Sequence, residues 1–489
     1  MKLSKGFLLL AFGLMSSVVL AQDNRLLTAY VGAMLIDVTS NVSISNSAIL
    51  IEGNRIKLVG ERDKVPIPDG VRTIDVRGKW ITPGLVDAHS HFFESGQIYP
   101  MLRRMSYTDV VSFDKEVAWM RARLPVTLES FVCAGVTSTI SAGGPKFEYD
   151  ARKMAERALR APNVFVAHGP ISAAPSEMIF SSFEGDTPVR TASSPEQAVA
   201  RVREGRGWGA DLIKTGYLGG PFAEMEKNYV ALLDAIIAES HRLGFPVTMH
   251  VKEVEPARSF VLAGVDSLQH TPSDTQIDDT FVELMLKKKT MIVPTLAVYR
   301  RLTLELPTQS IKLLPIEKRC GDPEVIETFT TANIPELSRE KLAKVNANLN
   351  MAKENAAKLY RAGVPIATGS DAGVPGVLHG PTLHYELKLL SEIGMSNQDI
   401  IKAATLNAAR VAGKDDLVGS IEAGKLADFL ILRADPLKDI SNLQEIETVV
   451  KDGIALDQDD LLPPDHLRNY KSFIGRHAVQ RNELPDKWD

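Results

Sequence analysis

Between residues 84 and 411 the chain alternates short apolar runs with longer segments in which apolar residues recur every three or four positions. The first pattern is typical of buried strands and the second of amphipathic helices. Several helical segments end in glycine just before the next run, as at Gly264 and Gly363, and glycine is the usual left-handed cap of a helix. The eight apolar runs fall at residues 85–86, 136–140, 164–167, 211–214, 246–249, 265–268, 291–293 and 365–368. Eight strand–helix units of this size predict an α/β fold, a parallel (β/α)8 barrel of the TIM type.

The two ends of the chain show a different pattern. Short β-branched runs broken by Gly, Asn and Asp occur between residues 26 and 80, and similar runs return at 424–432 and 447–453. Because no helical segments separate the first set, these runs predict hairpins and a small antiparallel sheet. We therefore expect a small β-sandwich domain built from both terminal regions. The predicted boundaries are 22–83 plus 412–458 for this domain, 84–411 for the barrel and 459–489 for a C-terminal extension.

Metal-competent side chains follow several of the predicted strands. His89 and His91 end the first run and lie on the same side of it, because side chains alternate along a strand. Two alternate histidines alone are weak evidence for a metal site, since imidazole also occurs in cores and on surfaces. Five of the other seven predicted strands, however, end at or are followed by such a side chain: His168, Lys214, His250, His270 and Asp371. Since barrels of this type carry their chemistry at the carboxyl ends of the strands, this pattern predicts a metal site there.

The same motifs resemble the amidohydrolase superfamily, and within it the imidazolonepropionase-like and prolidase-like metallo-dipeptidases. The resemblance rests on residues 83–91, 209–214, 247–250, 264–270, 368–372 and 418–428. It implies that one divalent ion is bound by His89, His91 and Asp371 and a second by His250 and His270. A carbamate formed on Lys214 would bridge the two ions. Zinc is the expected metal, with manganese, iron and cobalt as alternatives.

This ligand set suits the hydrolysis of an amide or peptide-like C–N bond. A bound divalent ion lowers the pKa of its water to about 7, and two ions can hold a bridging hydroxide. Asp371 would then act as the catalytic proton shuttle, first as general base and then as general acid. We expect a metal-dependent amidohydrolase, either a dipeptidase or a cyclic amide hydrolase.

Two alternatives remain open. His250 and Glu253 form an H-x-x-E motif that resembles mononuclear aminohydrolases, which deaminate rings, although such enzymes generally lack a lysine at the fourth strand. In that case Lys214 would be an unmodified lysine that pairs with a carboxylate or with substrate. The other alternative is a barrel that binds a ligand without catalysis.

Substrate contacts are harder to assign. His168 and Tyr217 follow the third and fourth predicted strands, and His379 comes soon after Asp371, so these three are candidates for substrate binding. Lys252, Tyr299, Arg300 and Arg301 are candidates for meeting a carboxylate near the rim. The long connection 294–363, with a predicted helix at 338–360, is either a lid or a surface feature.

Composition narrows the class of partner. The 489 residues are 44% hydrophobic and 24% charged, with a net charge of −5 and a pI near 6.1. No block of Lys and Arg with interleaved aromatic residues occurs, so we expect a small-molecule substrate and no nucleic acid. The sequence leaves open whether the chain forms a homo-oligomer.

Residues 1–21 have the pattern of a signal peptide. Lys2 and Lys5 precede the apolar run 7–20, and Ala21 stands at a suitable cleavage site. We expect a periplasmic or secreted protein with no stable membrane insertion after cleavage; an uncleaved anchor is the alternative. The two cysteines, Cys133 and Cys320, fall in very different sequence contexts, and we expect both thiols to be free.

Overall fold

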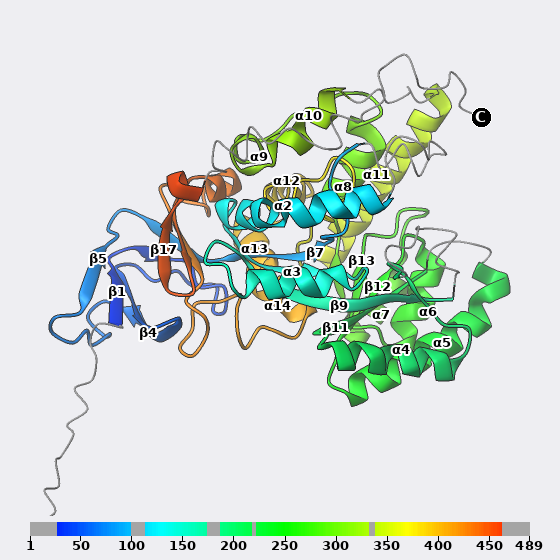
Figure 1. Ribbon diagram of the computed structural model, residues 1–489, viewed down its shortest axis with the longest axis horizontal. Coiled ribbons are helices and arrows are strands. Elements are labelled where there is room, and N and C mark those ends of the chain that lie inside the picture. The colour runs from blue at the N-terminus through cyan, green and yellow to red at the C-terminus, as the bar shows by residue number, and fades with distance from the viewer. Residues whose placement is uncertain (1–26, 99–112, 174–185, 218–221, 332–337, 462–489) are drawn as a thin grey trace, which may run out of the picture.

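The computed structural model describes residues 27–98, 113–173, 186–217, 222–331 and 338–461. The predicted signal peptide and all but residues 459–461 of the predicted C-terminal extension lie outside this range. Figure 1 shows two parts, a barrel surrounded by helices and a pair of β-sheets at one end of the molecule. The predicted α/β barrel with an additional β-structure is thus confirmed.

Seven parallel strands form most of the barrel wall. Each neighbouring pair is parallel, and the order in space follows the order in sequence, from β7 through β14. A short strand, β10 (Arg190–Thr191), pairs with β9 outside this order. The barrel strands are β7 (Leu85–Ser90), β8 (Val136–Ser141), β9 (Asn163–Ser172), β11 (Leu212–Gly216), β12 (Val247–His250), β13 (Ser267–Gln269) and β14 (Met291–Val293).

The eighth predicted strand, residues 365–368, closes the barrel without forming a regular strand. The amide of Ile292 donates to Pro365 O at 3.0 Å, and the amide of Ala88 donates to Thr368 O at 2.9 Å. This segment therefore bridges β14 and β7 through isolated pairings on its two sides. Asp371 lies three residues beyond this segment, and its backbone amide donates to His89 O at 2.8 Å.

The helices surround the barrel, and polar side chains cap the amino ends of several of them. Ser338 accepts a hydrogen bond from Lys341 N and begins the long helix α11, close to its predicted start. Ser194 and Asp278 cap α4 and α7 in the same way. The helices are α2 (Phe113–Cys133), α3 (Phe147–Ala155), α4 (Pro195–Trp208), α5 (Phe222–Arg242), α6 (Val254–Ala263), α7 (Asp279–Lys288), α8 (Leu296–Arg300), α9 (Pro315–Cys320), α10 (Pro323–Thr331), α11 (Arg339–Arg361), α12 (Leu383–Glu392), α13 (Asn397–Lys402) and α14 (Ala408–Val411).

Two β-sheets formed by both terminal regions pack face to face. In one, the order is β4-β3-β1-β5, and in the other it is β17-β16-β15-β6-β2. Tyr30 of the first sheet meets Phe429 of the second edge to face, with ring centroids 5.1 Å apart. The strands are β1 (Leu27–Val31), β2 (Met34–Leu35), β3 (Ser47–Glu52), β4 (Arg55–Glu61), β5 (Arg72–Asp75), β6 (Trp80–Pro83), β15 (Phe429–Leu432), β16 (Ile446–Lys451) and β17 (Ile454–Asp457).

Gly84 joins this β-structure to the barrel. It lies between β6, which pairs with β15, and β7, the first barrel strand. A Cβ atom at this position would lie 2.1 Å from the Thr137 hydroxyl oxygen of β8, so only glycine fits. The tight junction fixes where β7 begins and therefore where His89 and His91 come to lie.

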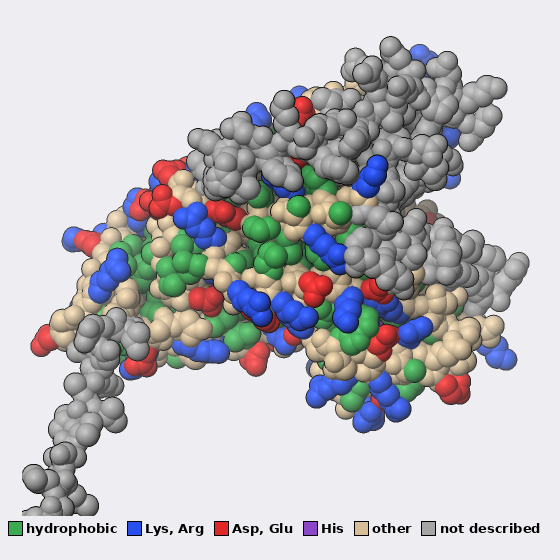
Figure 2. Space-filling view, viewed as in Figure 1, with side chains coloured by type: hydrophobic (Ala, Val, Ile, Leu, Met, Phe, Trp, Pro, Cys, Tyr) green, Lys and Arg blue, Asp and Glu red, His purple; other side chains and the backbone are tan. Residues whose placement is uncertain are grey.

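None of the helices in the described ranges is both long and apolar enough to cross a bilayer. On the face drawn in Figure 2, basic and acidic side chains are interspersed over the described surface.

The expectation of two free thiols is wrong, because Cys133 and Cys320 form a disulfide. The two residues end helices α2 and α9, and their Cα atoms lie 5.6 Å apart although 187 residues separate them in sequence. Sequence context could not reveal this pairing, since it depends on where the fold places two distant helix ends. Both side chains are fully buried.

Removing the disulfide should destabilise the fold. The Cys133→Ala/Cys320→Ala double variant is expected to lose about 2–5 kcal/mol of unfolding free energy, because the cross-link closes a long loop in the unfolded chain. Denaturant unfolding with and without reductant measures this loss, and the variant should no longer respond to reductant. Two titratable thiols in denatured, unreduced wild-type protein would contradict the pairing.

Candidate metal centre

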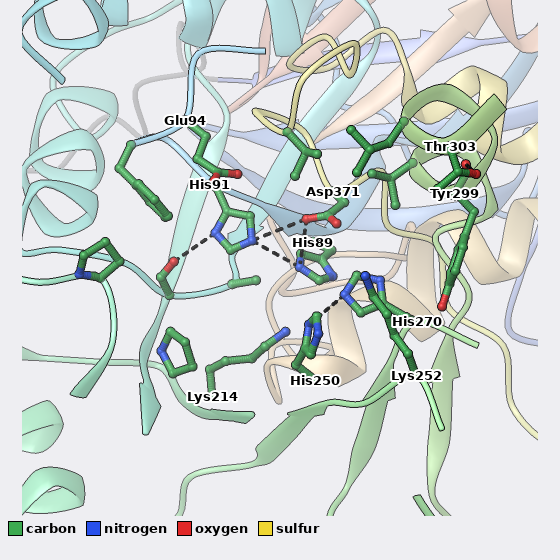
Figure 3. A pocket seen from close by; sticks show the side chains of 18 residues that line it. His89, His91, Glu94, Lys214, His250, Lys252, His270, Tyr299, Thr303 and Asp371 are labelled. Atoms are coloured by element: carbon green, nitrogen blue, oxygen red, sulfur yellow. Dashed lines mark hydrogen bonds and ion pairs between the residues drawn. The ribbon is translucent and has the colours of Figure 1, made fainter. Parts of the chain in front are cut away.

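A cavity of about 310 Å³ lies at the carboxyl ends of the barrel strands. The eighteen residues that line it are drawn in Figure 3. All six side chains predicted to bind metal lie on its wall: His89, His91, Lys214, His250, His270 and Asp371. The structure therefore brings together residues that are up to 282 positions apart along the chain.

The first group consists of His89, His91 and Asp371. Asp371 Oδ1 lies 3.1 Å from His89 Nε2 and 3.4 Å from His91 Nε2. The two Nε2 atoms are 3.3 Å apart. One potential ligand atom from each residue thus lies within 4.8 Å of the others, a spacing that suits a single ion.

The second group is a pair of histidines from neighbouring strands. His250 ends β12 and His270 follows β13, and His250 Nδ1 lies 2.9 Å from His270 Nε2. The Nδ1 atom of His270 is 2.7 Å from the hydroxyl of Thr295, which begins α8. This contact fixes the ring so that its Nε2 atom faces His250.

Lys214 of β11 reaches into the space between these groups, as Figure 3 shows. Its side chain is buried, and its Nζ atom has no hydrogen-bond partner among the described residues. Burial lowers the pKa of the amine to about 7, although the Asp371 carboxylate acts in the opposite direction. A large fraction of this amine is therefore uncharged near neutral pH.

Three imidazoles of the site are in the form that binds metal. Burial lowers the pKa values of His89, His250 and His270 well below the ordinary value, which keeps these rings neutral. Burial alone would raise the pKa of Asp371, but the neighbouring His89 and His91 hold it well below its usual range. The site thus offers neutral nitrogen ligands around one carboxylate.

Further hydrogen bonds fix the first group. His91 Nδ1–H donates to Gly143 O at 2.9 Å, which leaves Nε2 as the ring's free lone pair. Asp87 Oδ1 accepts from the amides of His89 and Ser370, at 3.1 and 3.0 Å. Asp87 therefore ties the end of β7 to the segment that carries Asp371.

Unusual backbone conformations also concentrate here. Asp371, His270 and Thr295 have φ values of +60°, +72° and +52°, in the left-handed region that side chains other than glycine rarely adopt. Such conformations cost free energy and persist only where the surrounding contacts enforce them. Gly369 shows how tight the packing is, since a Cβ atom there would lie 2.8 Å from His89 Cβ.

The three residues expected to contact substrate do not line the cavity. The strand containing His168 runs on to Ser172, so His168 lies within β9, and its ring faces Tyr149 and Trp208 of the helix layer. Tyr217 packs against Tyr229 and Phe260 in the core. His379 lies behind the site, where its Nε2–H donates to His91 O at 2.9 Å. Contact of these three residues with substrate therefore stays a prediction.

The candidates for the rim divide in a similar way. Lys252 and Tyr299 line the cavity. Arg301 is instead fully buried against Glu317 at 2.8 Å, and Arg300 pairs with Glu305 at 3.0 Å.

Other wall residues were not anticipated from the sequence. For Glu94, the one indication in the sequence that it could line the cavity was its position three residues after His91. The remaining newly identified wall residues are mostly apolar: Phe93, Ala142, Gly143, Pro170, Pro188, Val298, Leu302, Thr303 and Val374. Apolar residues carry no chemical signature in a sequence, so only the fold identifies them as wall residues.

Comparison with known proteins gives consistent matches. The family model described as "Amidohydrolase family" matches residues 80–455. Ochratoxinase from Aspergillus niger is 27% identical over 432 residues, covering 83% of this chain and 81% of that protein. Imidazolonepropionase from Pseudomonas fluorescens is 21% identical over 423 residues, covering 81% and 90%. The solved structure of a Xaa-Pro dipeptidase with methionine in its active site has a TM-score of 0.67 and 27% identity, covering 88% of this chain and all of that one.

Loss of the Thr295 hydroxyl should weaken metal binding. Thr295→Val removes the group beside His270 Nδ1 and is expected to lower metal affinity about 10–100-fold, because that contact orients the ring. Thr295→Ser keeps the hydroxyl and is the matched control. Metal affinity measured with a competing chelator checks this, and equal affinities for the two variants would contradict the assigned role.

Proposed function

We propose that this chain, which belongs to the amidohydrolase family, cleaves the amide bond of small dipeptide-like substrates with two divalent ions bridged by a carbamate on Lys214. The expected superfamily is confirmed by the family match, and with it a metal-dependent hydrolase of C–N bonds. The carbamate, the pair of ions and the substrate class are the proposal. The observation that carries it is the buried Lys214 amine between two groups of metal-competent side chains.

The residues present fit two ions. His89, His91 and Asp371 would hold one, and His250 with His270 the other. Lys214 has no partner as an amine among the described residues, and an unsatisfied buried donor is costly. Its uncharged form can attack carbon dioxide; a C–N bond forms, one proton leaves, and a carbamate anion results. The carbamate oxygens would then bridge the two groups. Zinc is the expected ion, with manganese, iron and cobalt as alternatives.

When bound, such ions supply a hydroxide at neutral pH and polarise the substrate carbonyl. Asp371 is placed to move the proton, since its carboxylate is buried and lies against the ligand nitrogens of His89 and His91. The carboxylate takes a proton during attack and returns it to the leaving amine nitrogen. The imidazoles of His91 and His270 hold their positions through the contacts with Gly143 and Thr295.

The cavity supports a small substrate. Its volume of about 310 Å³ is at the lower end for ligand sites. Its wall combines apolar side chains with a few polar ones, which suits a molecule of about two amino-acid residues. A similar structure is a Xaa-Pro dipeptidase, which also favours a dipeptide-like amide. Cyclic amides form the second group to be tested.

The one-metal deaminase has less support. Glu253, the acid of the H-x-x-E motif, stands at the start of α6 and is not among the residues that line the cavity. Lys252 lines it instead.

We also propose that the protein is exported. The N-terminal pattern of residues 1–21 is that of a cleaved signal peptide. The Cys133–Cys320 disulfide supports this proposal, since such bonds persist mainly in oxidising compartments.

Changing Lys214 should remove the bridge. Lys214→Ala is expected to bind fewer than two ions per chain and to lose at least about 100-fold in activity, as expected for loss of a bridging ligand. Short carboxylic acids should restore part of the activity by replacing the carbamate. Elemental analysis and turnover assays check this, with the exposed Lys288→Ala as control. Full metal content and activity in Lys214→Ala would contradict the bridge.

Asp371→Asn tests the proton shuttle. The variant should lose about 10²–10⁴-fold in kcat, since the amide cannot act as general base. Circular dichroism should remain native, and the exposed Asp416→Asn is the control. The assay uses dipeptides, N-acyl amino acids and cyclic amides with zinc or manganese. Absence of turnover across this panel with wild-type, metal-loaded protein would contradict the proposed function.

A further inference from the structure

We propose that the cavity selects dipeptides with both ends unblocked, with Lys252 binding the substrate carboxylate and Glu94 its ammonium group. This inference rests on the proposed amide hydrolysis and makes its substrate class specific. It follows from the charges that remain on the cavity wall once the metal-competent residues are set aside.

Two charged side chains remain among the described residues of the wall, Glu94 and Lys252. They have opposite signs. Figure 3 shows Glu94 on the side of His91, and Lys252 on the side of His250 and His270. The metal-competent cluster therefore lies between an acidic and a basic group. A dipeptide at neutral pH has the complementary arrangement, with the scissile amide between an ammonium group and a carboxylate.

Lys252 is held at the exposed edge of the cavity. Its carbonyl accepts a hydrogen bond from Ser273 N at 2.9 Å, which ties the turn after β12 to the turn after β13. Its Nζ atom lies 5.7 Å from the ring centroid of Tyr299, within the range of a cation–π contact. The Tyr299 hydroxyl in turn donates to Thr271 O at 3.0 Å, so the ring is fixed. The ammonium group is thus positioned, and solvent can reach it.

Glu94 is held on the opposite wall and is only 6% exposed. The turn that follows it is tied to the turn after Asp371, since Gly96 N donates to Gly373 O at 2.7 Å and Gly376 N donates to Gly96 O at 2.9 Å. The approach is close enough that a Cβ atom on Gly373 would lie 2.8 Å from Glu94 O. Glu94 is therefore fixed relative to Asp371, the proposed proton shuttle.

The apolar wall suits apolar side chains on such a dipeptide. Val298 and Val374 belong to one apolar cluster, against which Leu302 packs. Phe93, beside His91, and Pro170 also line the cavity.

Paired substrates test the inference. Leucylleucine, its C-terminal amide and its N-acetyl derivative are assayed with metal-loaded wild type, Lys252→Met and Glu94→Gln. Wild type should prefer leucylleucine over each blocked form by about 10–100-fold in kcat/KM, the effect of one charge-assisted hydrogen bond. Lys252→Met should abolish the preference for the free carboxylate and retain that for the free amine. Glu94→Gln should abolish the preference for the free amine and retain that for the free carboxylate. The exposed Lys287→Met should change neither preference.

Each other outcome is informative. Equal wild-type kcat/KM values for the three substrates would overturn the inference and leave amide hydrolysis standing. A variant that loses activity equally on all three, with normal metal content, would show a merely structural role and also overturn it. No turnover of any of the three, nor of the wider panel, would remove the proposed function and this inference together. If Glu94→Gln fails to fold, the wild-type comparison and the Lys252→Met variant still test whether the cavity selects unblocked dipeptides.

Discussion

The site depends on one constraint, the burial of a lysine amine at the centre of a polar cavity. Lys214 Nζ is shielded from water and has no hydrogen-bond partner among the described residues. An unsatisfied buried polar group costs about 1–3 kcal/mol, and more when it is charged. Burial lowers the pKa of this amine to about 7, so a large fraction of it is uncharged near neutral pH, but the uncharged amine still lacks a hydrogen-bond partner among the described residues. Conversion to a carbamate that binds two ions would give the group partners and explain why the fold tolerates it.

The rest of the structure holds the ligands around that lysine. Gly84 fixes where the first barrel strand begins, and residues 365–368 close the barrel so that Asp371 meets His89. Thr295 and Asp371 adopt left-handed conformations that are costly in isolation. These conformations keep the ligand atoms in place at a cost in folding free energy. The apolar core and the Cys133–Cys320 disulfide stabilise the fold and offset that cost.

Much of this arrangement was predictable because it follows from strand periodicity. The six metal-competent residues each stand at or just beyond the end of an apolar run, and all of them line one cavity. His168 does not line this cavity: its strand extends beyond the apolar run to Ser172, and its ring faces the helices. The disulfide and the position of Glu94 on the cavity wall depend on how distant turns and helix ends meet. No local sequence pattern predicts such contacts between segments that are far apart in the chain.

The central claim concerns Lys214, and a crystal structure of the zinc-loaded protein grown with bicarbonate tests it most directly. Anomalous scattering should show two zinc ions, one beside His89, His91 and Asp371 and the other beside His250 and His270. Electron density should continue from Lys214 Nζ into a carboxylate that contacts both ions. A single zinc ion together with an unmodified Lys214 amine would contradict the account.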